Sequence, residues 1–278
     1  MKRLLIPLVC LPLVFARGDE ETTTLILDAQ LLRVSGDLVG AAAKLGKVIT
    51  NDPSNTYARS LLGEVLLAEG KLDAAMQEFH YVQALDPEDE TAATWLGIIY
   101  LRKEQVEEAK EQFDGIVSRD VKNPNAHYFL GSIYLLLGQV EQAFHHLTLS
   151  RDYDALEPET HYRLGVVFHR LGLLANAELS YRRALELDSR HQEARNGLGW
   201  VLYTKGDVEK GIAEWTRVLQ VNPSNQEAAF NLAKVYHELG LKALKEGNDE
   251  TACGYWTKMI RIDPSNRAAK YYLDKYCK

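Results

Sequence analysis

Residues 56–89 read TYARSLLGEVLLAEGKLDAAMQEFHYVQALDPED and carry the pattern of two short helices joined by a turn. Gly63 lies in the first apolar run, where a small residue lets two helices approach closely. Gly70 interrupts the run, and Ala75 and Phe79, four residues apart, then lie on one face of a second helix. The stretch therefore predicts a helical hairpin.

The same hairpin pattern recurs along the chain at intervals of 34 residues. Small residues mark the first helix of each unit at Ala29, Gly63, Gly97, Gly131, Gly165, Gly199 and Ala233. Bulky residues mark each second helix at Leu45, Phe79, Phe113, Leu147, Tyr181, Trp215 and Trp256. Such a unit cannot bury its apolar face alone, so consecutive units are expected to stack on one another. Trp215 and Trp256 fall in the second column, and we expect both to be core residues.

A period of 34 with helical patterning resembles the tetratricopeptide repeat family over residues 22–266. Prolines at 53, 87, 223 and 264 fall at the closing position of that family's repeat. The resemblance implies an all-α fold, a right-handed α-solenoid of seven 34-residue helix-turn-helix repeats with a C-terminal capping helix. The repeats are assigned to residues 22–55, 56–89, 90–123, 124–157, 158–191, 192–225 and 226–266, and the capping helix to 267–278.

The last repeat, residues 226–266, is longer than the others by seven residues, which we place near Gly240 to Gly247. Seven residues correspond to about two helical turns, so the insertion can lengthen the first helix of this repeat by about 10 Å. A tolerated loop insertion is the commoner event in repeat proteins and is the favoured alternative.

The N-terminus is a segment of a different kind. Lys2 and Arg3 precede an apolar run of 12 residues, Leu4 to Phe15, and small residues follow. This order predicts a signal peptide, residues 1–16, cleaved after Ala16 or Gly18. The run is shorter than the roughly 20 residues of a membrane-spanning helix, so we expect no integral membrane segment in the mature chain. We expect export to the periplasm or cell envelope, and secretion is an alternative. A lipoprotein anchored at Cys10 is less favoured, because Val9 stands before this cysteine where a lipoprotein signal has a small residue.

Charge and motif content limit the function classes. The formal charge is −7, and loss of residues 1–16 removes Lys2 and Arg3 but no acid. An acidic chain is a poor match for nucleic acid, which is therefore not expected as a partner. The adjacent His145 and His146 point apart on a helix and have no further ligands at metal spacing. With nearly the whole chain assigned to repeats, we expect no enzyme activity, no metal site and no cofactor.

The resemblance also implies a binding surface, since the first helices of this family line a concave groove that holds a segment of a protein or peptide partner. The groove residues assigned here are apolar or aromatic in the first half and more polar from Tyr162 onward. They are Leu61, Glu64, Trp95, Ile98, Tyr128, Phe129, Tyr162, Arg163, His169, Asn196, Trp200, Tyr203, Asn231 and Lys234.

Two cysteines, Cys253 and Cys277, remain after the predicted cleavage. Their midpoint lies in the turn at residues 264–266, so in an antiparallel helix pair they stand at the same height. In an oxidising compartment they can form a disulfide that fixes the capping helix, and two separate buried thiols are the alternative.

The sequence is thus interpreted as a non-catalytic protein–protein interaction scaffold of the cell envelope that binds a peptide or helix of a partner in the groove. A regulatory or carbohydrate-handling subunit of an envelope enzyme complex is the alternative, favoured if the aromatic groove holds sugar. The sequence names neither the partner nor the pathway.

Overall fold

The computed structural model describes residues 20–277, and every regular element in this range is an α-helix. The predicted signal peptide, its two cleavage positions and Cys10 lie outside the described residues. The helices are α1 (Glu20–Ser35), α2 (Leu38–Asn51), α3 (Thr56–Ala68), α4 (Leu72–Leu85), α5 (Glu90–Arg102), α6 (Val106–Arg119), α7 (Pro124–Leu136), α8 (Val140–Tyr153), α9 (Pro158–Arg170), α10 (Leu174–Leu187), α11 (Gln192–Thr204), α12 (Val208–Val221), α13 (Gln226–Lys245), α14 (Asp249–Ile262) and α15 (Arg267–Tyr276).

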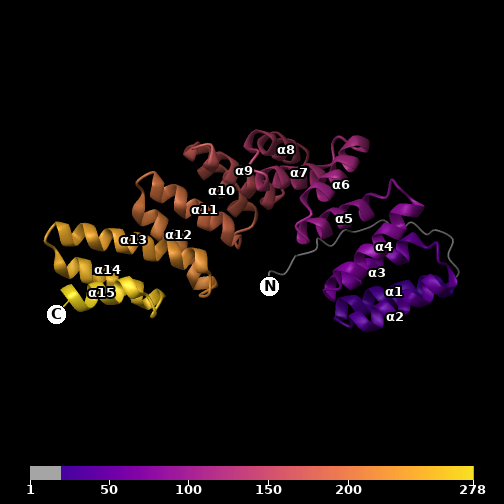
Figure 1. The fold of residues 1–278 in the computed structure, drawn as a ribbon, viewed down its shortest axis with the longest axis horizontal. Coiled ribbons are helices and arrows are strands. Elements are labelled where there is room, and N and C mark those ends of the chain that lie inside the picture. Colours follow the sequence, from indigo (N-terminus) through magenta and orange to yellow (C-terminus); the bar gives the residue numbers. More distant parts are fainter. Residues whose placement is uncertain (1–19, 278) are drawn as a thin grey trace. The chain divides into compact units, whose positions relative to one another are not determined.

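The helices form consecutive hairpins, which Figure 1 shows in chain order. The chain divides after Ile116, inside α6, into two compact units. In the first unit α1 packs on α2 and α3 on α4, while α2 and α4 each contact the helix that follows. In the second unit the pairs are α7 with α8, α9 with α10, α11 with α12 and α13 with α14, again with contacts from each second helix to the next first helix. Each unit is therefore a stack of helix-turn-helix repeats, as the 34-residue period predicts.

The repeated glycines lie where the two helices of a hairpin cross. A Cβ atom added at Gly63 would lie 2.6 Å from the ring of Phe79, and one at Gly199 would lie 2.7 Å from the indole nitrogen of Trp215. Gly97, Gly131 and Gly165 have the same relation to Phe113, Leu147 and Tyr181. The missing side chain makes room for the large residue of the second helix, which is fully buried. Trp215 and Trp256 are core residues, as predicted.

The last hairpin shows where its seven additional residues lie. Helix α13 has 20 residues, whereas α11 has 13, so the insertion lengthens the helix instead of forming a loop. A Cβ added at Gly240 would lie 2.5 Å from Trp256, so Gly240, and not Ala233, occupies the crossing position. The placement of the insertion at Gly240 to Gly247 is therefore wrong, because the added residues precede Gly240. Seven residues turn a helix by nearly two full turns, which leaves the packing face almost unchanged.

A second recurring contact fastens the turn before a hairpin to that hairpin's first helix. Arg59 donates from Nε to the carbonyl oxygen of Pro53 at 2.8 Å. Nε2 of His127 and of His161 lies 3.1 and 3.0 Å from the carbonyl oxygens of Val121 and Ala155, six residues earlier in each case. Arg195 makes the same contact with the carbonyl of Ser189 at 2.8 Å. Since a carbonyl can only accept, both imidazoles carry their proton on Nε2.

The turns inside the hairpins require one residue with positive φ. Gly70 (φ +80°) serves in the second hairpin, and glycines at 36, 138, 172, 206 and 247 serve elsewhere. In the third hairpin the residue is Glu104, with φ 61°. A side chain in this left-handed region costs about 1–2 kcal/mol, so this turn carries local strain.

The C-terminal helix α15 begins as the first helices do. Asn266 accepts a hydrogen bond from the backbone N–H of Ala269, as Asn225 does from that of Ala228 in α13. Ala269 is fully buried against α14, and the Tyr272 ring stacks on Trp256 with centroids 4.8 Å apart.

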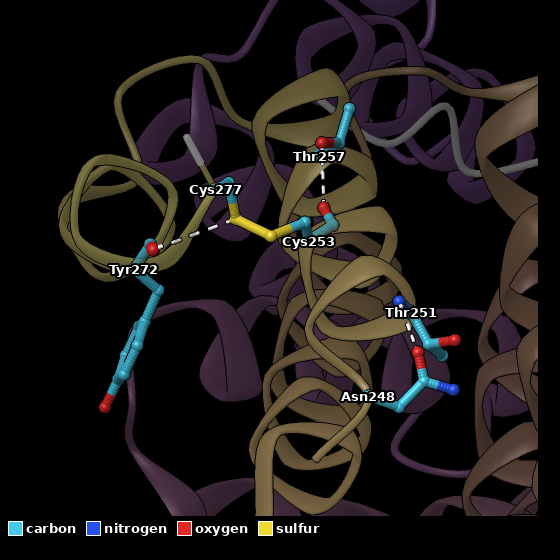
Figure 2. Close-up of a disulfide and its surroundings, with 6 residues drawn as sticks. All are labelled: Asn248, Thr251, Cys253, Thr257, Tyr272 and Cys277. Atoms are coloured by element: carbon cyan, nitrogen blue, oxygen red, sulfur yellow. Dashed lines mark hydrogen bonds between the residues drawn. A yellow bond between two sulfur atoms is a disulfide. The ribbon is translucent and has the colours of Figure 1, made fainter.

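A disulfide joins Cys253 of α14 to Cys277, directly after α15 (Figure 2). Their Cα atoms are 5.7 Å apart. Sγ of Cys277 lies 3.9 Å from the carbonyl oxygen of Tyr272, and because a disulfide sulfur has no proton this is a contact and not a hydrogen bond. The bond holds the C-terminal end of α15 against α14.

Candidate functional site

The predicted groove residues divide by burial. Leu61 has 5% of its surface exposed and packs with Ala58 and Val65 in the N-terminal core cluster. Asn196 is 1% exposed, and its amide donates to Oε2 of Glu227 at 3.0 Å. Both side chains are buried in contacts within the protein, and their assignment as partner contacts stays a prediction. Asn231 is also buried, with 7% exposed.

In the first unit the groove residues are engaged with one another. Glu64 forms an ion pair with Arg33 and interacts with the Trp95 indole. Burial raises the pKa of Glu64 despite the opposing effect of both partners. The Trp95 ring also stacks on Phe79 with centroids 6.1 Å apart. Ile98, three residues after Trp95, is half-buried. Trp95 and Glu64 remain partly exposed, whereas Phe79 is fully buried.

The second unit contains a connected polar network across its first helices. Arg163 of α9 lies 3.2 Å from Oε1 of Glu159 and interacts with the Tyr128 hydroxyl of α7. Tyr128 packs edge-on against Phe129. The other oxygen of Glu159 lies 3.1 Å from Nε2 of His191, the residue that precedes α11. The network therefore ties α7, α9 and α11 together along one face.

His191 is held between two carboxylates. Burial disfavours its charged form, but Glu159 and Glu193 outweigh this effect and raise the pKa of His191 to about 9. The hydrogen bond to His191 and the charge of Arg163 likewise hold the pKa of Glu159 below its ordinary value, although burial acts in the opposite direction. Nδ1 of His191 also lies 3.3 Å from the backbone nitrogen of Ala194, at the start of α11.

Tyr162 interacts electrostatically with all three carboxylates of this face, Glu159, Glu193 and Glu227. Its ring is 4.9 Å from that of His191. Burial raises the pKa of Tyr162 to about 12; Arg163 opposes this, and Glu159, Glu227 and Glu193 add to it. The phenol therefore stays neutral at physiological pH, chiefly because it is buried.

The three glutamates were missed in the sequence, although a signal was present. Glu159, Glu193 and Glu227 stand 34 residues apart, each six residues before the small residue of its repeat. The groove residues assigned from the sequence begin three residues before that small residue, about one helical turn after these glutamates, and so omit them. The period that predicts the fold also identifies this carboxylate column.

Toward the C-terminal end of this face the residues are aromatic and basic. The Trp200 ring is half-buried, 6.3 Å from that of Trp215, and Nζ of Lys234 lies 4.5 Å from its centroid. The Tyr203 hydroxyl donates to Glu238. Phe230 has 68% of its surface exposed, and it occupies the same repeat position as Tyr128, Tyr162 and Asn196. His169 is half-buried, and burial lowers its pKa.

The arrangement offers hydrogen-bonding groups, charges and ring faces along adjacent first helices. Within residues 20–277, no group of three or more His, Cys, Asp or Glu side chains is placed to hold a metal ion. No helix in the same range is both long and apolar enough to span a membrane.

Comparison with protein families gives one description throughout. Two family models, both described as tetratricopeptide repeat, match this sequence. The first matches residues 33–80 and 66–133, and the second matches 147–192, 163–215 and 196–244. No curated protein matches the chain.

Several solved structures share the fold at low sequence identity. The C-terminal part of a tetratricopeptide repeat protein from Cytophaga hutchinsonii is 16% identical, with a TM-score of 0.67 over 88% of this chain and 98% of that chain. A repeat protein from Parabacteroides merdae is 16% identical, with a TM-score of 0.62 over 93% and 99%. YrrB, described as having an unusual peptide-binding site, is 22% identical, with a TM-score of 0.52 over 66% and 95%.

Proteins of this family are generally non-catalytic, and the fold suggests a scaffold for protein–protein interaction. The 34-residue period, the glycine crossings and the family matches lead to one conclusion. The chain belongs to the tetratricopeptide repeat family.

Proposed function

We propose that this protein is a scaffold of the cell envelope that binds a peptide or helix of a protein partner on the first-helix face of its second unit. This face consists of the exposed sides of α7, α9, α11 and α13. The observation that carries the proposal is Phe230, a large aromatic side chain left 68% exposed in the same repeat column as Tyr162. Half-buried Trp200 and its Lys234 neighbour extend the aromatic surface. Aromatic side chains of this kind dominate the energetics of protein interfaces.

The structural neighbours support binding of a peptide without identifying one. YrrB has a described peptide-binding site, but at 22% identity the likeness shows only the fold. Recognition in this protein must therefore depend on its own residues.

The envelope location is supported by two features. The N-terminal sequence has the order of a signal peptide, and the disulfide between Cys253 and Cys277 suits an oxidising compartment. Mass spectrometry of the native protein tests this part of the proposal. We expect an N-terminus near Arg17 or Asp19, and a native chain that still begins at Met1 would contradict export.

Binding is tested with a matched pair of surface variants. Phe230→Ser removes the exposed ring from α13, and Leu179→Ser removes a side chain of similar exposure, 69%, from the second helix α10. The wild-type protein is used to capture its partner from envelope extract, and affinities of the purified partner are then measured for both variants. We expect Phe230→Ser to weaken binding about tenfold or more and Leu179→Ser to leave it unchanged.

Two outcomes would contradict the proposal. Equal affinity of both variants would place the binding surface elsewhere. Stable binding of soluble glycans to the Phe230 face, without a protein partner, would favour the carbohydrate-handling alternative.

A further inference from the structure

Helix α13 carries polar residues that lie outside the ion pairs around Arg163 and His191. Glu227, Asn231 and Lys234 follow one another at spacings of four and three residues and so share a face of the helix. Phe230 adjoins them and is exposed. We call Glu227, Phe230 and Asn231 the α13 site.

Among residues 20–277, Glu227 is the carboxylate of the column for which no ion pair is found. Glu159 has Arg163 and His191, and Glu193 has His191 at 3.5 Å. Glu227 is exposed, and within residues 20–277 its hydrogen bond comes from the neutral amide of Asn196. Its charge nevertheless reaches Tyr162 and the buried Tyr181. Glu227 therefore offers a carboxylate without an ion pair at the start of α13, whereas Lys234, two turns further along the same face, lies over the Trp200 ring at 4.5 Å.

Asn231 supplies an independent indication of a ligand. It is more than nine-tenths buried, yet no hydrogen bond to its amide is found among the described residues, and its amide atoms are not sealed from solvent. A buried amide normally has partners in the protein. Asn231 lies one turn after Glu227 on the same face of α13, so its amide belongs to the same surface as the carboxylate. An amide both donates and accepts, which matches a peptide group.

We propose that the α13 site binds a lysine or arginine side chain of an extended partner segment. The partner's cation pairs with Glu227, the adjoining peptide group hydrogen-bonds Asn231, and the aliphatic stem lies along the Phe230 ring. An acidic segment would meet Glu227 and Glu193 instead. The inference rests on the proposed function, because it names the chemistry of the partner bound on the same face.

The test uses a random library of twelve-residue peptides, selected in parallel on four proteins. These are the wild type, Glu227→Gln, Asn231→Ala and the control Glu209→Gln. Glu209 is exposed on the second helix α12 and undergoes the same change of charge. Selected peptides are then synthesised with each Lys or Arg replaced by Gln, and their affinities are measured at low and high salt.

On the wild type and on Glu209→Gln we expect enrichment of Lys or Arg at one fixed position, and on Glu227→Gln the enrichment disappears. A selected peptide binds Glu227→Gln about tenfold more weakly than the wild type, and replacing its own basic residue causes a similar loss. Asn231→Ala weakens the binding of every selected peptide, whatever its basic residue. The melting temperature of this variant stays close to that of the wild type. A large drop in its melting temperature would mean that Asn231 is structural and would overturn its assigned role.

Failure of the inference and failure of the proposed function differ in their results. Peptides that lose affinity on Phe230→Ser but carry no enriched Lys or Arg, or carry Asp or Glu, would overturn the basic-segment inference alone. A library that yields no binder, or binders insensitive to Phe230→Ser, would overturn both.

Discussion

Oε2 of Glu159 lies 3.1 Å from Nε2 of His191, and this pair joins α9 to the residue before α11. The pair adds to the direct packing of α9 on α11 and to the contact of α10 with α11. Because His191 is largely buried, the charge state of one imidazole affects the stacking of two repeats.

The stability of the protein should fall as the pH rises above neutrality. The pKa of His191 is raised from its ordinary 6.5 to about 9, so the folded state binds this proton more tightly than the unfolded state. The stabilisation is fully present below pH 6.5 and is lost as the pH rises through 9. We expect the wild-type melting temperature to decline across this window and His191→Gln to show a flatter profile, measured by calorimetry from pH 6 to 10.

His145→Gln is the control for this titration, because His145 is an exposed histidine of α8. It should keep the wild-type slope. Parallel slopes for the wild type and His191→Gln would show that another group controls the decline.

Two glycine-to-alanine substitutions should act in opposite directions. At Gly199 the new methyl group would lie 2.7 Å from Trp215, a fully buried ring, and overpacking of this kind costs about 1–3 kcal/mol. At Gly254, in α14, nothing lies within 4 Å, so the better helix former should add about 0.5–1 kcal/mol. Urea unfolding of both variants measures the difference. If Gly199→Ala proves neutral, the crossing is not tightly packed.

The turn at Glu104 offers a stabilising substitution. Glu104 has φ 61°, a conformation that glycine adopts without steric cost. Glu104→Gly should therefore increase the free energy of unfolding by about 1 kcal/mol, after allowance for the greater freedom of the unfolded chain. The same substitution at exposed, helical Glu111 should lower it by about as much. Thermal melting of the two variants tests this contrast. A loss of stability in both would show that the backbone at Glu104 is not strained.

Removal of the disulfide should loosen the C-terminal end before the rest of the unit. The bond closes a sequence separation of 24 residues, for which chain-entropy arguments give about 3 kcal/mol. A protein with Cys253→Ser and Cys277→Ser should show faster amide hydrogen exchange in α15, with exchange in α11 unchanged. Thiol titration of the denatured, unreduced wild type is the direct check, since two free thiols would show that the bond is absent from the native protein.

The fold was predictable because its cause is local and repeated. Each crossing glycine meets one large residue of the next helix, so the column from Gly63 to Gly199 records the same packing event again and again. The exception is the last hairpin, where Gly240 lies at the crossing in place of Ala233. A seven-residue insertion preserves the helical face, and the sequence alone could not distinguish Ala233 from Gly240 as the crossing residue.

The candidate site was less predictable because burial on the first-helix face depends on the neighbouring hairpin. Asn196 occupies the same repeat position as exposed Phe230, yet it is buried since Asn225 and Glu227 of the next hairpin bind its amide. Leu61 is buried by its neighbours in the core cluster in the same way. A position in the repeat thus defines a face, whereas contacts between repeats decide which side chains remain available.

The disulfide attaches a helix, α15, that begins in the same way as the first helices of the repeats. With its Asn266 cap and buried Ala269, α15 is a first helix, but in the described chain no second helix follows it. The first helices α9, α11 and α13 each pack on the preceding second helix and on the second helix of their own hairpin, whereas α15 packs on α14 and, through Tyr272, against His237 of α13. The covalent bond between Cys253 and Cys277 therefore attaches the C-terminal end of α15 to α14, at the end of the helix where α9, α11 and α13 each continue into a second helix of their own.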